Sequence, residues 1–366
     1  MERLLPKYLK NKAKLGLIEN RPPDKTFTGI VVIPVLAELE NIETTLQSLS
    51  EVEGEFGIFL VVNNRADEQD LRIAENQKLL QQLRNGEFSK IDDLMWIDCS
   101  SPEKELPDNR GVGLARRIGM DSALPLLNPN GLLFSLDADC LVEKDYLTAA
   151  QKTLTKSVDA GCFWFKHQKA ESTEIQAGID AYENYLTHYV DGLKLANSPY
   201  AYHAIGSIIA VTAKAYILAD GMPLKRQAAE DFYFLQNVAK HCPVKTIAST
   251  VYPSARLSSR TPFGTGQQMI EFTTNQAAKD NFSNQAFLEL KQLLETIEIH
   301  IDQPKLNLQK LTISDYSKST LETIGFNNFW QKLQQNYQTK PQKLKAFHRW
   351  FDALKTLKYI KAFQEK

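Results

Sequence analysis

Cysteine is scarce in this chain of 366 residues, and the four that occur are far apart with no Cys-x-x-Cys pair: Cys99, Cys140, Cys162 and Cys242. This spacing suits reduced, mostly buried thiols in a reducing compartment better than a disulfide framework or a zinc site. No apolar run approaches the roughly 18–20 residues of a membrane-spanning helix. Residues 1–14 carry lysine and arginine without the apolar core of a signal peptide. We therefore expect a cytoplasmic protein, with peripheral membrane contact left open.

A strong net charge is also missing. The 43 basic and 44 acidic residues leave a formal charge of −1, which argues against a nucleic-acid partner. Hydrophobic residues make up 43% and charged residues 24%, as in ordinary globular proteins. There is no internal repeat and no low-complexity segment. A chain of this length can bury a large core and suggests about two domains.

Apolar runs of strand type alternate with helical patterns over about the first two thirds of the chain. Such alternation predicts an α/β fold with a mostly parallel sheet and helices on both faces. The predicted strands are 29–35, 56–62, 94–98, 131–136, 160–165, 207–211 and 244–248, and the predicted helices are 40–49, 71–83, 113–124, 143–154, 174–195 and 230–240. From about residue 280 the pattern changes to amphipathic helices alone. We predict a lead-in over 1–26, a catalytic domain over 27–275 and a helical region over 276–366.

The most informative stretch is Asp137-Ala138-Asp139, which follows the apolar strand 131–136. Parallel strands bind ligands at their carboxyl ends, and paired carboxylates supply the hard oxygen ligands that Mg²⁺ or Mn²⁺ prefers. Taken alone, the same three residues also fit an ordinary turn that caps a helix. The neighbouring motifs decide between a turn and a metal site.

Residues 33–42 lie where the first strand meets the first helix, and their order is Ile-Pro-Val-Leu-Ala-Glu-Leu-Glu-Asn-Ile. This stretch resembles the opening signature of family 2-type glycosyltransferases, and the resemblance continues in order over roughly residues 28–275. It implies a GT-A fold, which is Rossmann-like, and a nucleoside diphosphate sugar as donor. It places Pro34, Val35 and Glu38 at the nucleotide site.

Two further motifs resemble the nucleotide-binding parts of the family. Asn63 and Asn64 end the second strand where the family usually has an acidic pair, and amides can hydrogen-bond both donors and acceptors of a base. Residues 108–121 resemble the glycine-containing loop before the third helix, in which Gly113 lets backbone approach the ligand and Arg110 faces a phosphate or base carbonyl. The adjacent arginines at 116 and 117 point to different helix faces, so at least one is expected at the surface.

The acid pairs carry the chemistry that the resemblance implies. Asp139 corresponds to the direct metal ligand, and Asp137 lies nearer the ribose or a metal-bound water. Glu230-Asp231 resembles the acidic pair whose aspartate is the general base of inverting members, so Asp231 takes that role and Glu230 positions it. Two acids in the first turn of a helix also fit simple capping. The order of all the motifs favours catalysis.

Three more segments carry residues that fit either a sugar and diphosphate site or a structural role. Gly206 and Ser207 leave room for the sugar or the acceptor, whereas His203 fits a structural role as well as a functional one. Arg256 and Arg260 lie in a glycine-bearing segment over 252–267, placed to close over the diphosphate, although a solvated connector has the same pattern. The aromatic residues of 163–165 fit both the core and a platform on which a sugar stacks, and the core is favoured because alternation buries at least every second one.

The last helical pattern carries an apolar stripe among basic residues: Leu344, Phe347, Phe351, Leu354, Leu357 and Ile360. Packing against the catalytic domain explains the stripe, and so does contact with an anionic membrane carrying a lipid-linked acceptor. The acceptor itself, lipid-linked or saccharide, is not specified.

These residues predict a metal-dependent glycosyltransferase that uses Mn²⁺ or Mg²⁺, with inversion as the expected stereochemistry. The alternatives are a retaining enzyme of the same fold, a nucleotidyltransferase, and a nucleotide-sugar-binding module without activity. The nucleotidyltransferase is disfavoured because residues 34–41 lack a glycine-rich basic loop.

Overall fold

A computed structural model of the chain describes residues 3–155, 157–224, 229–256 and 280–364. They form two compact units, one from parts of 1–180 and 204–277, the other from 181–203 and parts of 278–366. The first unit includes the segment predicted as a separate lead-in. The second takes the C-terminal half of a helix that the sequence assigned to the catalytic domain.

The first unit is built on a nine-stranded sheet with strand order β1-β4-β3-β2-β5-β8-β7-β9-β6. The pairings make six strands parallel to one another and leave β1, β6 and β8 antiparallel to them. The predicted class, a mostly parallel α/β sheet, is confirmed. The strands β1 to β9 span Ile18–Glu19, Phe27–Val35, Gly57–Asn63, Leu94–Cys99, Leu127–Ser135, Leu141–Val142, Ala160–Phe165, Ile209–Thr212 and Val244–Tyr252.

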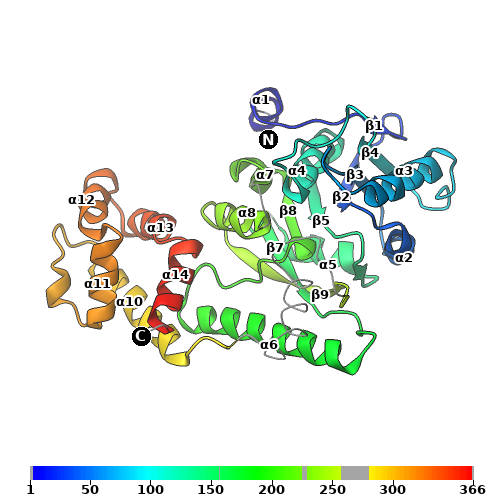
Figure 1. Ribbon diagram of the computed structural model, residues 1–366. Helices are drawn as coiled ribbons and strands as arrows, with labels where there is room; N and C mark the ends of the chain where they lie inside the picture. The colour runs from blue at the N-terminus through cyan, green and yellow to red at the C-terminus, as the bar shows by residue number, and fades with distance from the viewer. Residues whose placement is uncertain (1–2, 156, 225–228, 257–279, 365–366) are drawn as a thin grey trace. The chain divides into compact units, whose positions relative to one another are not determined.

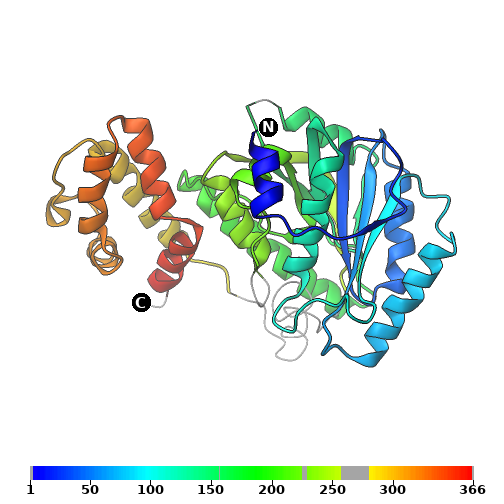
Figure 2. The same cartoon turned by 90° about the horizontal axis from the view of Figure 1, so that it is seen from above.

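Helices cover both faces of this sheet (Figure 2). The chain runs from β2 through β3 to β4 in one direction, and then β5 forms on the other side of β2. Right-handed crossovers therefore place α2 and α3 on one face and α4 on the other. Sheets of this kind bind ligands where the strand order reverses, which here is between β2 and β5. The helices of this part, α1 to α8, span Leu4–Asn11, Leu39–Ser50, Asp70–Arg84, Val112–Ala123, Tyr146–Thr153, Thr173–Leu195, Ala213–Leu218 and Glu230–Ala239.

The first 26 residues are part of the fold, because they contain α1 and the edge strand β1, which pairs with β4. The hydroxyl groups of Tyr8 and Tyr216 each donate a hydrogen bond to the buried Asp121 carboxylate at 2.8 Å. Arg117 Nε donates to the same carboxylate at 3.0 Å, and its Nη1 donates to the Asp220 carbonyl at 2.6 Å. A buried carboxylate with this many donors fixes α1 against α4 and α7.

The second unit consists of helices, as predicted for the C-terminal region. Its core combines side chains from the end of α6 with those of the C-terminal helices. Phe347, Phe351 and Ile360 of the apolar stripe are buried in this core, so the stripe packs within the helical unit. The helices α10 to α14 span Asn284–His300, Asp315–Thr323, Phe326–Asn336, Lys340–Trp350 and Ala353–Gln364.

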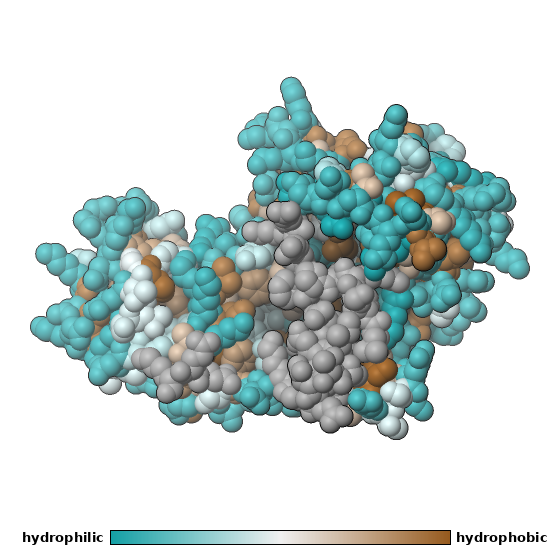
Figure 3. Space-filling view, viewed as in Figure 1, coloured by the Kyte–Doolittle hydropathy of each residue, from teal (hydrophilic) through white to brown (hydrophobic). Residues whose placement is uncertain are grey.

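The exposed surface seen in Figure 3 is mainly hydrophilic, with apolar residues scattered over it. Among the described helices, none is both long and apolar enough to cross a bilayer. All four cysteines are free, and only Cys242 is not fully buried. The expected reduced, mostly buried thiols are therefore confirmed.

Candidate active site at the carboxyl edge of the sheet

The Asp137-Ala138-Asp139 turn follows β5 at the point where the strand order reverses. Residues 131–135 are buried in the sheet, and the Leu136 amide still donates to the Val32 carbonyl of β2 at 3.1 Å. The chain then turns, with the Cys140 amide donating to the Asp137 carbonyl at 3.2 Å. The Asp137 side chain is 39% exposed and that of Asp139 is 19% exposed. Both carboxylates thus stand at the edge of the sheet where a ligand can reach them.

Arg256, which follows β9, bridges the two strand ends. Its Nη2 contacts Asp139 Oδ2 at 2.8 Å and also forms an ion pair with Glu38, which precedes α2. The predicted nucleotide residue Glu38, the predicted metal ligand Asp139 and the predicted diphosphate residue Arg256 therefore meet at one point. Arg260 lies outside the described residues.

A second arginine, Arg116 of α4, joins the two acid pairs that the sequence singled out. Its Nη2 is bonded to Asp137 and its Nη1 to Glu230, and both the Arg116 and Glu230 side chains are 5% exposed. Burial lowers the pKa of the guanidinium, but the charges of Asp137 and Glu230 outweigh it and raise that pKa above its usual value. The prediction that one of the two arginines lies at the surface is wrong, since Arg116 and Arg117 are both buried. Nearly all residues of α4 are buried, and each of the two arginines forms an ion pair with a carboxylate inside the fold.

Two predicted glycines make room for this arrangement. A Cβ on Gly206 would lie 2.6 Å from Arg116 Nη2 and 2.8 Å from its Cζ. A Cβ on Gly113 would lie 3.1 Å from the Cβ of Glu230. Any side chain at position 206 would push the guanidinium from its carboxylates, so Gly206 is required by Arg116. Ser207 is buried beside it, in the short 3₁₀ turn that leads into β8.

Asp231 stands in the first turn of α8, directly after Glu230. Its Oδ1 accepts a hydrogen bond from the Phe232 amide at 2.7 Å. Burial, and secondly the negative charge of Glu230, raise the pKa of Asp231 to about 7, although Arg116 acts in the opposite direction. A carboxylate with a pKa near neutrality can accept a proton and release it at the pH of the cell. This property is the one a general base needs.

The Asp139 carboxyl is also perturbed. Burial, followed by the negative charges of Glu38 and Asp137, raises its pKa to about 6, and Arg256 offsets part of the effect. Three carboxylates in one place repel one another unless cations lie between them. The two arginines supply such positive charge within the chain itself.

The predicted nucleotide residues of β2 and β3 are held by backbone contacts. Pro34 and Val35 belong to the buried strand β2. The Asn63 amide donates to the Val35 carbonyl at 2.9 Å and to the Val61 carbonyl at 3.1 Å, so its NH₂ group ties the two strands together. The amide of Asn76 in α3 donates to the Asn63 carbonyl at 3.0 Å, and this side chain was not singled out from the sequence.

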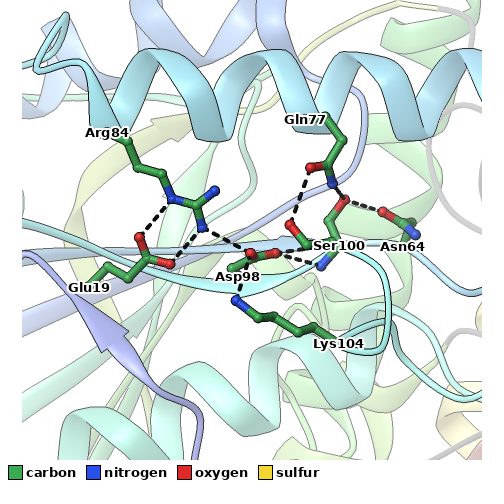
Figure 4. A network of polar contacts seen from close by, with 8 residues as sticks. Glu19, Asn64, Gln77, Arg84, Asp98, Ser100 and Lys104 are labelled. Atoms are coloured by element: carbon green, nitrogen blue, oxygen red, sulfur yellow. Dashed lines mark hydrogen bonds and ion pairs between the residues drawn. The ribbon is translucent and has the colours of Figure 1, made fainter.

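A network of hydrogen bonds and ion pairs surrounds the carboxyl end of β4, the strand that pairs with β3 (Figure 4). Asp98 accepts from Arg84 Nη2 at 2.9 Å and from Lys104 Nζ at 3.1 Å, and Arg84 also pairs with Glu19. The Ser100 hydroxyl donates to Asn64 Oδ1. The amide donors of the following turn outweigh burial and hold the pKa of Asp98 well below its usual value. This network fixes the start of the segment that leads to Arg110.

The predicted Arg110 is engaged by the chain, since its Nη1 donates to the Leu224 carbonyl at 2.6 Å. It thereby connects the glycine loop with the segment before the acid pair. His203 belongs to the helical unit, where burial lowers its pKa to about 4, in keeping with the structural alternative.

Asp137 and Asp139 are chemically suited to a divalent cation. They offer carboxylate oxygens on a partly exposed turn, and Mg²⁺ in such sites is held by one or two carboxylates while water and substrate phosphates complete the shell. Within the described parts of the chain, no group of three or more His, Cys, Asp or Glu side chains is arranged to hold a metal. The fit therefore requires a diphosphate to supply the remaining ligands.

Comparison with known proteins adds only a distant likeness. No family model and no curated protein matches the chain. Among solved structures, it is similar to S. aureus TarS 1-349, with 14% identity, 88% of this chain and 80% of that chain covered, and a TM-score of 0.40. It is also similar to the mannosyltransferase PcManGT from Pyrobaculum calidifontis, solved with GDP-Man and Mn²⁺, with 14% identity, 94% and 92% covered, and a TM-score of 0.42. At this level the likeness concerns the path of the backbone, and the chemistry has to follow from the chain's own side chains.

Proposed function

We propose that this protein is a metal-dependent glycosyltransferase of the GT-A, family 2-like type. It transfers a sugar from a nucleoside diphosphate sugar to an acceptor hydroxyl with inversion. The observation that carries the proposal is the ion-pair link from Asp137 through Arg116 to Glu230. That link brings Asp137 and Asp139, which suit a cation bound to a diphosphate, next to Glu230 and Asp231. The pKa of the Asp231 carboxyl is raised to about 7.

Each group has a role in a single displacement. Asp231 accepts the proton of the acceptor hydroxyl while the acceptor oxygen forms a bond to the anomeric carbon. The bond from that carbon to the diphosphate oxygen breaks, and the nucleoside diphosphate leaves with the electron pair. A divalent cation held by Asp139 and Asp137 would stabilise the negative charge that develops on the leaving group.

The arginines and glycines organise the site around this reaction. Arg256 contacts Asp139 and is close enough to the turn to neutralise a diphosphate beside it. Arg116 keeps Asp137 and Glu230 in fixed relation, and Gly206 leaves the space that its guanidinium occupies. The nucleoside would lie toward β2 and β3, near Glu38, Asn63 and Gly113.

Thermal unfolding with a panel of UDP- and GDP-sugars, with and without Mn²⁺, tests donor binding. A donor that binds the native state raises the unfolding temperature. The same donors are then tested for transfer by the wild type and by Asp231→Asn, which we expect to bind donor normally but turn over about 10²–10⁴-fold more slowly. Donor binding without transfer to any acceptor would leave the inactive binding module as the better description. NMR of the product anomer separates inversion from retention.

A further inference from the structure

Trp164 is an exposed aromatic side chain near the end of β7, and the residues of β7 before it are buried. The first four residues of β7 are buried, whereas Trp164 is 54% exposed, which corrects its assignment to the core. Phe163 stacks on Tyr146 with ring centroids 4.3 Å apart, so that it fills the face covered by α5. Because successive side chains of a strand point to opposite faces, Trp164 lies on the other face.

The end of β7 lies at the same edge of the sheet as the candidate site. β7 and β5 are both antiparallel to β8, which lies between them, so β7 and β5 run in the same direction. Gln168, four residues after Trp164, donates through its Nε2 to the Asp139 carbonyl and to the Tyr252 carbonyl, each at 2.8 Å. The chain leaving Trp164 is therefore hydrogen-bonded to the Asp-x-Asp turn.

Trp164 also shares its face of β7 with Cys162, a thiol whose pKa is affected by the charge of the proposed base Asp231. Cys162 stands two residues earlier, on the same face as Trp164. Burial raises the pKa of the Cys162 thiol, and the negative charge of Asp231 adds to the increase. The charge of Asp231 therefore acts on the face of β7 to which Trp164 also belongs.

We propose that Trp164 is the platform on which a pyranose ring of the acceptor stacks. A sugar ring has apolar C–H faces and a hydroxyl-bearing rim, and an exposed indole beside polar groups suits that combination. Lys166, an exposed residue directly after β7, carries an ammonium group that can donate hydrogen bonds to the rim. A nucleobase is a poorer fit, because the proposed nucleotide residues lie on the β2–β3 side of β5 and β7 lies on the other side.

This inference rests on the proposed function and names its acceptor as a saccharide. The probes are methyl β-D-glucopyranoside, methyl α-D-mannopyranoside and N-acetylglucosamine. Of the four tryptophans, Trp164 is exposed, Trp350 is half-buried, and Trp96 and Trp330 are buried, so the part of the iodide quenching that is lost in Trp164→Phe reports on Trp164. A stacked sugar should reduce that quenching, and saturation-transfer NMR should show contact with one face of the ring.

Substitutions separate stacking from simple apolar contact. Trp164→Leu keeps apolar surface but lacks a flat ring, and we expect it to bind the pyranosides about tenfold more weakly by NMR titration. Trp164→Phe keeps a ring and should retain a smaller part of the affinity. Ile299→Ala, which shortens an apolar side chain that is 74% exposed in the helical unit, is the matched control and should change nothing.

The outcomes distinguish this inference from the proposed function. If nucleoside diphosphate sugars stabilise the protein but no pyranoside protects Trp164, or Trp164→Leu binds as tightly as the wild type, the stacking platform is wrong and the transferase proposal stands. If no donor stabilises the wild type, the transferase proposal fails first. A normal donor-dependent thermal shift in each variant shows that the variant is folded, so a loss of pyranoside binding cannot be ascribed to unfolding.

Discussion

Replacing Arg116 with methionine should strongly destabilise the α/β unit. The guanidinium is the one group that bonds both Asp137 and Glu230 among the contacts of the described chain. Methionine has a similar length but carries no charge and donates no hydrogen bond. Arg116→Met therefore leaves the Glu230 carboxylate buried beside Asp231, with no cation to offset its charge.

The expected magnitude follows from the burial of the partners. Removing one partner of a buried ion pair costs about 3–5 kcal/mol, because the other charge stays buried without compensation. Most of this loss should come from Glu230, whose side chain is 5% exposed. Asp137 is 39% exposed, so water screens its charge and its share is small. The double variant Arg116→Met/Glu230→Gln should recover more than half of the loss, since the buried charge is then absent.

Urea unfolding without metal or nucleotide measures this effect. Because the chain has two compact units and four tryptophans, the protein is labelled with 5-fluorotryptophan, and the transition of the α/β unit is followed by the ¹⁹F NMR signal of the buried Trp96. A double-variant cycle then isolates the coupling between Arg116 and Glu230. A loss below about 1 kcal/mol in Arg116→Met, or no recovery in the double variant, would refute the reasoning.

The remaining predictions concern the same site. Gly206→Ala places a Cβ 2.6 Å from Arg116 Nη2, so it should lower stability by about 1–3 kcal/mol and also slow transfer, as urea unfolding and initial rates would show. The kcat/KM of transfer should fall as the pH drops through about 7, because protonated Asp231 cannot accept a proton; a profile that stays flat down to pH about 5 would exclude it as base. Asp139→Ala should abolish the Mn²⁺-dependent part of the thermal stabilisation by nucleoside diphosphates, and a retained Mn²⁺ effect would place the cation elsewhere.

The strands and helices of the α/β unit were largely predictable because they depend on local patterns. The strand over 160–165 matches β7 at both ends, and the helix over 230–240 matches α8 to within one residue. The place of the segment before residue 27 could not be predicted, because α1 is short and is held by a hydrogen bond to the buried Asp121, far along the chain. That Asp137 and Asp139 share one turn was also predictable, because they are only two residues apart.

By itself, the sequence determined which carboxylates, glycines and arginines stand near the strand ends, because this order is local and can be read along the chain. Only the tertiary structure decided how they combine. The partners of Arg116 come from 21 and 114 residues away along the chain. Trp164 is exposed because it stands near the end of β7, after four residues that are buried on both faces, and the place of β7 beside the site depends on β8 lying between it and β5. Such relations arise when distant segments pack, so no periodicity along the chain records them.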